Sequence, residues 1–377
     1  MASRTRAATL TGALLLTTAT LAAQSSLTAP GPAQDPQVLR WVERALAWCP
    51  GSSFEITEDE RRVTASGSYR RVVVERSCDN PFLAGGSTLL IDEVTGTAWL
   101  GSVARLPLQQ AGASPVGLRG FLESFLPEAL LANLRMKVRL SWDPGPYRSG
   151  ALIPFTLLVD TGYGEYPKPV AVSSDGDLLV IGSGMPLSAD PVAHRARLLR
   201  DSGAVMWDHG GDDAKVDIVE FSDLECPACR SKWPLITAQL EKHGAALRHG
   251  MVSYPLTTIH PWSFRAAAAT WCVAAQQPEQ VVPFKELFYD LQKDMEVSLV
   301  TSTALDFVAG NGLDEEAFRA CYLRSPSLAR VHEQIALAHG LGVMSTPTYF
   351  VNGWLVQVPT EDWFSKMVSR LAAGQEP

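Results

Sequence analysis

The chain has 377 residues, which is long for one domain and sufficient for two or three. Hydrophobic residues make up 46% and charged residues 19%, the balance of a globular protein rather than a disordered one. The formal net charge is −8, and no dense run of Lys and Arg occurs. This charge argues against a phosphate-binding surface, so we expect no nucleic-acid partner.

The first 23 residues have the pattern of a secretory signal peptide. Arg4 and Arg6 precede a run of small and apolar residues, and the pair Ala22-Ala23 offers a cleavage site. We therefore expect the mature protein to be periplasmic or secreted. The alternative is an uncleaved membrane anchor, which the modest length of the run and its threonines disfavour.

The cysteine count is even, as expected for an exported chain in an oxidising compartment. The six cysteines are Cys49, Cys78, Cys226, Cys229, Cys272 and Cys321. Several pairings are formally possible, and position along the chain suggests Cys49 with Cys78, Cys226 with Cys229, and Cys272 with Cys321. The alternative for the two outer pairs is buried free thiols that act as small hydrophobic residues.

Residues 35 to 187 carry no active-site motif and are interpreted as two related helix-then-sheet units, 35–110 and 111–187. Apolar residues at helical spacing predict a helix from Gln37 to Trp48 and another from Gly117 to Leu134. Strand-like runs follow each helix, at 69–74, 87–91 and 97–103, and at 136–142, 152–159, 169–172 and 178–181. The alternative is one irregular α+β domain whose Asp-Gly and Thr-Gly turns look alike by chance.

Residues 188–205 are polar and arginine-rich, and we expect them to form a helical linker. Arg195, Arg197 and Arg200 are interpreted as a solvated face rather than a binding patch.

A Cys-Pro-Ala-Cys motif at 226–229 follows an apolar strand, 216–221, and opens a helix. Trp233, Ile236 and Leu240 recur behind it at helical spacing. Unpaired N–H groups and the positive end of the helix dipole favour a thiolate there. The two intervening residues let one sulfur attack a disulfide while the other resolves the mixed disulfide. The motif therefore predicts redox chemistry, with half of a zinc site as the alternative.

The rest of the chain predicts a strand, a helical stretch and a return to the sheet. The second strand spans 247–254, and the sheet resumes at Thr348. The helices are predicted at 264–275, 282–291, 303–309, 328–338 and 361–371. Among the histidines, His209, His243 and His249 are interpreted as surface residues, and His260 as a residue at a helix start.

Three further features make the cysteine motif specific. Glu220 lies six positions before Cys226, Pro234 lies five positions after Cys229, and Thr346-Pro347 precedes an apolar strand. These spacings resemble the thioredoxin superfamily, in which a buried acidic residue and a cis-proline accompany the cysteine pair.

The stretches 221–229 and 342–347 are most similar to the DsbA-like branch of that superfamily. The resemblance implies an α/β thioredoxin fold for residues 206–377, with a helical insertion at about 257–340. The preceding α+β units resemble cystatin-like domains. The stretch 172–187 resembles the end of the N-terminal domain of DsbC-like isomerases, and this resemblance implies a homodimer.

The site residues follow from this resemblance and from their positions. Cys226 is expected to be the nucleophile, and Cys229, a turn deeper in the helix, the resolving thiol. Glu220 would exchange a proton with Cys229, and burial should raise the pKa of its carboxyl; the alternative is a carboxylate at a strand end. Thr346 and Pro347 would bring backbone groups against the disulfide.

We therefore expect an exported thiol:disulfide oxidoreductase that forms, reduces or isomerises disulfides. Its expected partners are cysteine-containing exported proteins and a membrane redox partner. No cofactor and no metal are expected, because the cysteine pair is the redox centre. The sequence leaves the direction of the redox reaction open. The competing function is a metal-handling or holdase protein that uses the thiols as soft ligands.

Overall fold

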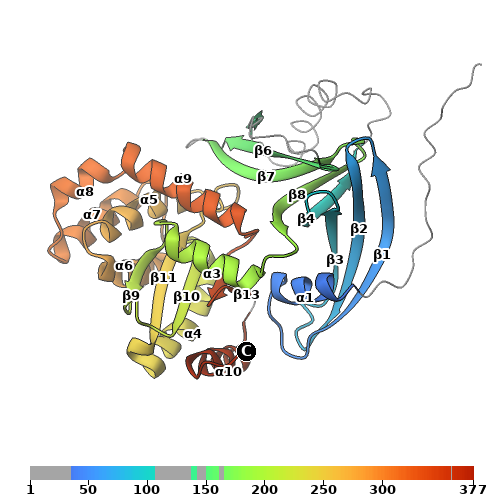
Figure 1. Cartoon of the computed structure of the whole chain (residues 1–377). Coiled ribbons are helices and arrows are strands. Elements are labelled where there is room, and N and C mark those ends of the chain that lie inside the picture. The colour runs from blue at the N-terminus through green and yellow to red at the C-terminus, as the bar shows by residue number, and fades with distance from the viewer. Residues whose placement is uncertain (1–34, 107–136, 142–149, 161–164, 358) are drawn as a thin grey trace, which may run out of the picture.

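The computed structural model describes residues 35–106, 137–141, 150–160, 165–357 and 359–377. These residues form two sheets, an eight-stranded one in the order β1-β2-β3-β4-β8-β7-β6-β5 and a five-stranded one in the order β13-β12-β10-β11-β9 (Figure 1). The expected signal peptide, 1–23, and the expected helix at 117–134 lie outside the described residues.

The N-terminal part is a helix packed on an antiparallel sheet. Helix α1 (Pro36–Ala45) begins at Asp35, whose carboxylate accepts hydrogen bonds from the N–H groups of Gln37 and Val38. Its buried residues pack on the first four strands of the sheet. The strands are β1 (Ser53–Thr64), β2 (Gly67–Ser77), β3 (Gly85–Asp92), β4 (Thr97–Arg105), β5 (Lys137–Ser141), β6 (Leu152–Asp160), β7 (Glu165–Ser173) and β8 (Leu178–Pro186).

The predicted first helix is confirmed, although it ends before Trp48. Strand β1 was not predicted, because its run of Glu, Asp and Arg hides the alternation typical of a strand. Charged side chains of β1 form ion pairs with side chains of neighbouring strands and are not simply exposed to solvent. Arg71 of β2, for example, donates to both carboxylate oxygens of Asp59.

Strands β4 and β8 join two four-stranded meanders into one sheet. They pair antiparallel over their whole length, and Gly101 lies opposite Gly182. A Cβ atom at Gly182 would lie 2.2 Å from the carbonyl oxygen of Leu100, and one at Gly101 would lie 2.1 Å from that of Ile181. The strands can therefore approach this closely only because both residues are glycine. The proposed boundary between units at residues 110 and 111 lies outside the described residues and stays a prediction.

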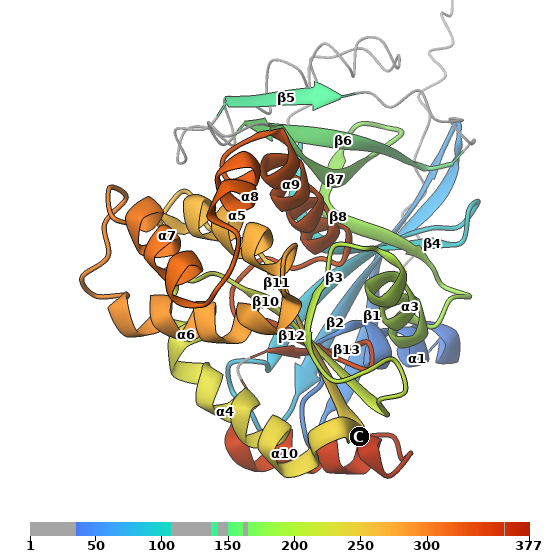
Figure 2. The same cartoon turned by 90° about the vertical axis from the view of Figure 1, so that its left-hand side faces the viewer.

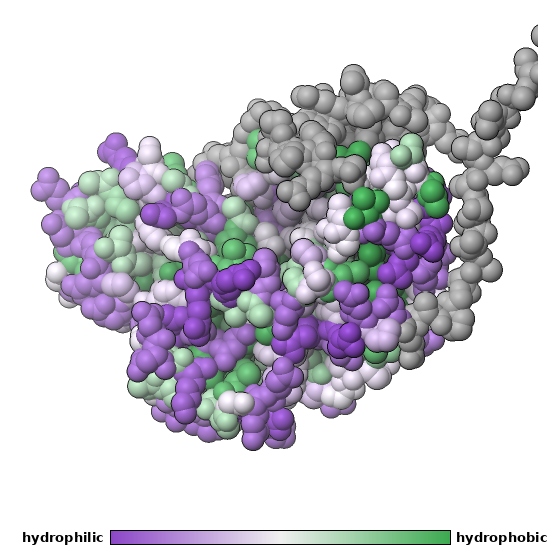
Figure 3. All heavy atoms as spheres, viewed as in Figure 1, coloured by the Kyte–Doolittle hydropathy of each residue, from purple (hydrophilic) through white to green (hydrophobic). Residues whose placement is uncertain are grey.

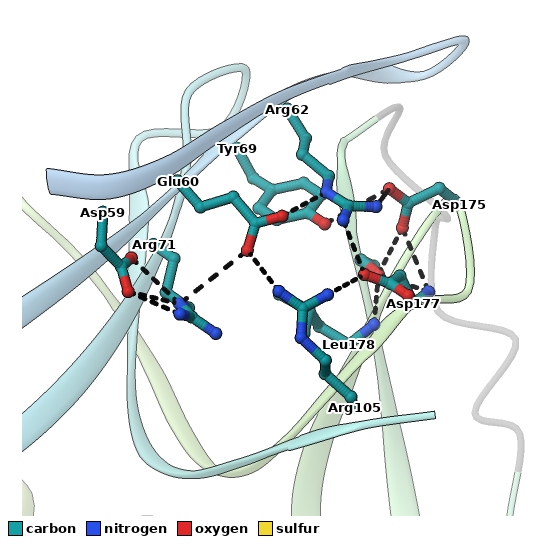
Figure 4. Close-up of polar contacts among 10 residues, drawn as sticks. Asp59, Glu60, Arg62, Tyr69, Arg71, Arg105, Asp175, Asp177 and Leu178 are labelled. Carbon is teal, nitrogen blue, oxygen red and sulfur yellow. Dashed lines mark hydrogen bonds and ion pairs between the residues drawn. The ribbon is translucent and has the colours of Figure 1, made fainter. Parts of the chain in front are cut away.

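A network of ion pairs ties the same two meanders together at one end of the sheet (Figure 4). The buried Glu60 of β1 accepts hydrogen bonds from Arg62 at 2.5 Å and from Arg105 of β4 at 3.0 Å. Both arginines also reach Asp177, in the turn between β7 and β8. The turn of the second meander is thus held by charges from the first.

The C-terminal part is a mixed sheet covered by helices (Figure 2). Strands β10 and β11 are parallel, and β9, β12 and β13 pair antiparallel with their neighbours. The elements are α3 (Pro191–Asp201), β9 (Met206–His209), β10 (Val216–Ser222), α4 (Pro227–His243), β11 (Leu247–Ser253), α5 (Ser263–Ala274), α6 (Val281–Leu291), α7 (Val300–Gly310), α8 (Glu315–Cys321), α9 (Ser325–Gly340), β12 (Thr348–Val351), β13 (Trp354–Gln357) and α10 (Glu361–Ala372).

The predicted helical insertion between β11 and β12 is confirmed, and it holds α5 to α9. The short elements β9 and α8 were not predicted, because four and seven residues are too few to show a period. The interpretation of the linker arginines as a solvated face is wrong for Arg195, which is buried. Its guanidinium donates to the carbonyl oxygens of Arg44 and Ala45 at the end of α1.

The two parts of the molecule also meet at the edge strand β13. The backbone N–H of Trp48 donates to the carbonyl oxygen of Leu355 at 2.7 Å, and the Trp48 ring lies 5.2 Å from that of Trp363 in α10. On the face shown in Figure 3, hydrophilic residues cover much of the described surface, with hydrophobic residues among them. Within the described ranges, none of the helices combines the length and apolar character needed to span a membrane.

We expect Gly182→Ala to destabilise the chain by about 1–3 kcal/mol, because its Cβ would press on backbone atoms that cannot move without separating β4 from β8. Chemical denaturation at equilibrium measures this change. Gly310→Ala is the matched control, since a Cβ atom there meets nothing within 4 Å. Equal stability of the two variants would contradict the role assigned to Gly182 in the pairing of β4 with β8.

Candidate functional site

The two free cysteines lie at the N-terminus of α4, where the central strand β10 ends. Cys226 is the N-cap residue, and its backbone N–H donates to the carbonyl oxygen of Asp223 at 3.0 Å. The helix starts at Pro227, inside the motif, as the prediction that the motif opens a helix requires. Cys226 is 6% exposed and Cys229 0% exposed, so Cys226 is the thiol nearer the surface.

The surroundings shift the two thiols in opposite directions. A hydrogen bond from the Cys229 thiol, aided by the backbone N–H groups of Cys229 and Ala228, lowers the pKa of Cys226 to about 6. Burial raises the pKa of Cys229 well above its usual value, and the nearby charges of Cys226 and Glu220 raise it further. At neutral pH the arrangement thus holds one thiolate and one protonated thiol.

The loop before β12 faces the first cysteine. The peptide bond between Thr346 and Pro347 is cis. The carbonyl oxygen of Thr346 lies 3.6 Å from the sulfur of Cys226. Because Pro347 has no N–H, this edge of the site presents a backbone acceptor without a donor beside it.

Glu220 lies inside β10 and is completely buried. The expectation that its pKa is raised is wrong. Burial alone would raise the pKa of the carboxyl, but the buried ammonium of Lys285 from α6 forms an ion pair with Oε2, and the imidazole of His249 lies 3.6 Å from the same oxygen. Together these cations lower the pKa of Glu220 to about 2.

The interpretation of His249 as a surface residue is also wrong. His249 is completely buried, because β11 lies between β10 and β9 and is covered on both faces. Its Nδ1 lies 2.6 Å from Oδ1 of Asp208 in β9. The ring of Trp233 from α4 lies 5.6 Å from the imidazole and 3.7 Å from the ammonium of Lys285.

The sequence analysis did not identify Lys285, His249 or Asp208 as part of the site, although the position of Lys285 offered a signal. It stands four residues from Val281 and four from Tyr289, on the apolar stripe of the predicted helix. A lysine on such a stripe predicts a buried partner. Asp208 left no such signal, because strand β9 is too short to predict. His249 lies in the predicted strand 247–254, but its partner Asp208 comes from the unpredicted β9.

His260 lies beside the turn between β10 and α4 that leads to Cys226. Its Nδ1 is 2.7 Å from Oδ2 of Asp223, and this hydrogen bond raises the pKa of the imidazole. Its carbonyl oxygen accepts from Ser263, the first residue of α5, as expected for a helix-start residue. Glu225, next to Cys226, accepts from the backbone N–H of Trp262, and burial raises its pKa to about 7.

The other four cysteines are joined in two disulfides. Cys49 and Cys78 have Cα atoms 6.1 Å apart, and Cys272 and Cys321 have Cα atoms 5.8 Å apart. The first ties the segment after α1 to the end of β2, and the second ties α5 to α8 inside the insertion. Within the described part of the chain, no cluster of three or more His, Cys, Asp or Glu side chains is arranged to hold a metal ion.

The C-terminal part of the chain is similar in sequence to known proteins. Residues 202–370 match the family model described as "Thioredoxin". The chain is 30% identical over 144 residues to the Na(+)/H(+) antiporter NhaA 3 of Salinispora tropica, a match that covers 38% of this chain and 21% of the antiporter. It thus spans about a fifth of the length of that relative.

A second relative is the disulfide bond formation protein D of Bacillus subtilis. It is 26% identical over 151 residues, which cover 39% of this chain and 68% of that protein. Among solved structures, oxidised BdbD from Bacillus subtilis aligns with a TM-score of 0.41 and 22% identity, over 46% of this chain and 95% of that one.

We expect Lys285→Met to destabilise the protein by about 3–5 kcal/mol at pH 7, because it leaves the carboxylate of Glu220 buried without its cation. The pKa of Glu220 in the folded state, about 2, is below its unfolded value, so its stabilising contribution is present above about pH 4.3 and is lost as the pH falls towards 2. In Lys285→Met this acid-side loss should shrink.

Urea unfolding between pH 3 and 7 measures both effects. The double variant Glu220→Gln/Lys285→Met is the control, since it removes both charges and should recover most of the lost stability. A double variant as unstable as Lys285→Met alone would refute the ion pair as the cause.

Replacing both Cys272 and Cys321 by Ser should lower stability by about 4 kcal/mol, because the disulfide closes a loop of 49 residues in the unfolded chain. Denaturation of the oxidised protein and of the double variant, side by side, measures the difference. Equal midpoints for the two proteins would show that the bridge adds nothing.

Proposed function

We propose that this chain, whose residues 202–370 match a thioredoxin family model, is a DsbA-like thiol:disulfide oxidoreductase acting on exported proteins. The observation that carries the proposal is the opposite environment of two neighbouring thiols. Cys226 has a pKa lowered to about 6, and Cys229 has one raised well above its usual value. An attacking thiolate and a protected resolving thiol are what disulfide exchange requires.

In the proposed reaction, the thiolate of Cys226 attacks one sulfur of a substrate disulfide. The substrate S–S bond breaks, its first thiolate leaves, and a mixed disulfide with Cys226 forms. Cys229 then loses its proton and attacks the sulfur of Cys226, which releases the second substrate thiolate and closes the Cys226–Cys229 disulfide. The reverse sequence transfers a disulfide to a substrate dithiol.

The remaining site residues have supporting roles in this proposal. Glu220 is the group through which the proton of Cys229 leaves, because its carboxylate is the buried acid on the strand that leads to the motif. Thr346 and Pro347 border the reacting sulfur, and the carbonyl of Thr346 accepts from the Cys226 thiol when it is protonated.

The proposed location is outside the cytoplasm, where the substrates are other exported proteins. The two disulfides support this location, since such bridges persist in oxidising compartments. The proposed partners are cysteine-containing exported proteins and a membrane protein that restores the redox state of the pair. The part formed by α1 and the eight-stranded sheet would hold the catalytic domain through its contacts at Arg195 and Trp48.

Cys226→Ser should abolish exchange with a model peptide disulfide, whereas Cys229→Ser should accumulate a mixed disulfide with the peptide. The reason is that only Cys226 combines a lowered pKa with a place near the surface. Mass spectrometry of acid-quenched mixtures detects both outcomes. The double replacement of Cys272 and Cys321 by Ser is the control and should keep the exchange reaction. Exchange by Cys226→Ser at a near-normal rate would overturn the proposed function.

A further inference from the structure

Three buried ionisable side chains form a row across three neighbouring strands. Asp208 comes from β9, His249 from β11 and Glu220 from β10, and all three side chains are completely buried. Oδ1 of Asp208 lies 2.6 Å from Nδ1 of His249, and Nε2 of the same ring lies 3.6 Å from Oε2 of Glu220. Because Oδ1 of Asp208 accepts a hydrogen bond from the N–H at Nδ1, the other ring nitrogen, Nε2, which faces Glu220, is the one that can gain or lose a proton.

Glu220 alone is poorly suited to take up the proton of Cys229. Lys285 forms an ion pair with its Oε2, and a carboxylate with a pKa near 2 is a weak base at neutral pH. The residue of the row that can change its charge near neutral pH is therefore His249.

The groups that face His249 come from β9, β10, α4 and α6. Asp208 of β9 and Glu220 of β10 are anions, Lys285 of α6 is a cation, and α4 contributes the ring of Trp233. Burial and Lys285 lower the pKa of the imidazole, but Asp208 and Glu220 outweigh them and raise it to about 8.

We propose that Asp208 and His249 are positioning residues for the resolving step, in which Nε2 of His249 takes up, through Glu220, the proton that Cys229 loses. This inference rests on the proposed function and deepens it. Asp208 fixes the ring so that Nε2 faces the carboxylate, and His249 gives the proton a destination that Glu220 does not offer by itself.

The step balances in atoms and electrons. The S–H bond of Cys229 breaks, and its electron pair forms the Cys226–Cys229 bond. The bond between Cys226 and the substrate breaks, and its electron pair leaves with the substrate sulfur as a thiolate. The proton moves to the carboxylate of Glu220 and then to Nε2 of His249. The cysteine pair loses two electrons, and the substrate disulfide gains them.

The test separates the two half-reactions of the full-length protein. The reduced protein is mixed rapidly with a peptide disulfide that releases a coloured thiol at each step, so attack gives the first release and resolution the second. In the unsubstituted protein, the rate of resolution should rise as the pH passes through about 8, where His249 loses its proton. In His249→Gln this rise should disappear, and resolution at pH 8.5 should be about 100-fold slower. The attack step should not change.

Asp208→Asn provides a second, independent test, which remains informative even if the His249→Gln variant does not fold. It keeps the shape of the side chain but removes the anion that raises the pKa of His249, so the rise in resolution rate should move to lower pH. A purely structural role of Asp208 would not move that midpoint.

His339→Gln is the matched control, because His339 is also a buried histidine but contacts Tyr254 and the carbonyl of Pro167 instead of the row. It should keep the pH profile of the unsubstituted protein. Circular dichroism confirms that each variant is folded. An unshifted profile in both His249→Gln and Asp208→Asn, or equal slowing of attack and resolution, would overturn this inference. Loss of exchange in Cys226→Ser would still support the proposed function in either case.

Discussion

The ion pair between Glu220 and Lys285 is the constraint on which the catalytic half depends. Neither charge can be buried alone, because the loss of hydration costs more than the surrounding apolar groups return. The pair therefore requires α6 of the insertion to lie against the central strand β10. Trp233 of α4 covers the ammonium of Lys285, so the active-site helix is held at the same point. The position of the cysteines and the docking of the insertion are consequences of one buried contact.

The same helix separates two chemically identical thiols. Cys226 is at the N-terminus of α4, where backbone N–H groups are unpaired and a negative charge is stabilised. Cys229 lies one turn later, surrounded by apolar groups and close to the anion of Glu220. A difference of one helical turn thus produces a thiolate and a protected thiol, and no cofactor is needed to explain this asymmetry.

The N-terminal sheet depends on close approach at its centre. Gly101 and Gly182 let β4 and β8 pair, while Arg62 and Arg105 hold the turn at Asp177. This sheet meets the catalytic half through side chains of two kinds. Arg195 satisfies carbonyl groups at the end of α1, where a cation is favourable, and Trp48 packs on the aromatic surface of α10. The two parts are therefore joined by specific contacts in addition to the connecting chain.

The amino-acid sequence by itself determined the features that are local along the chain. The strand before Cys226, the helix after it and the spacing to Glu220 depend on neighbours within a few residues, and each was predicted. Strand β1 was not predicted, because only its pairing with β2 provides partners for its charges. The burial of His249 and the depressed pKa of Glu220 were decided by the tertiary structure alone. Both depend on Asp208 and Lys285, which lie tens of residues away and become neighbours only when the sheet and the insertion close over them.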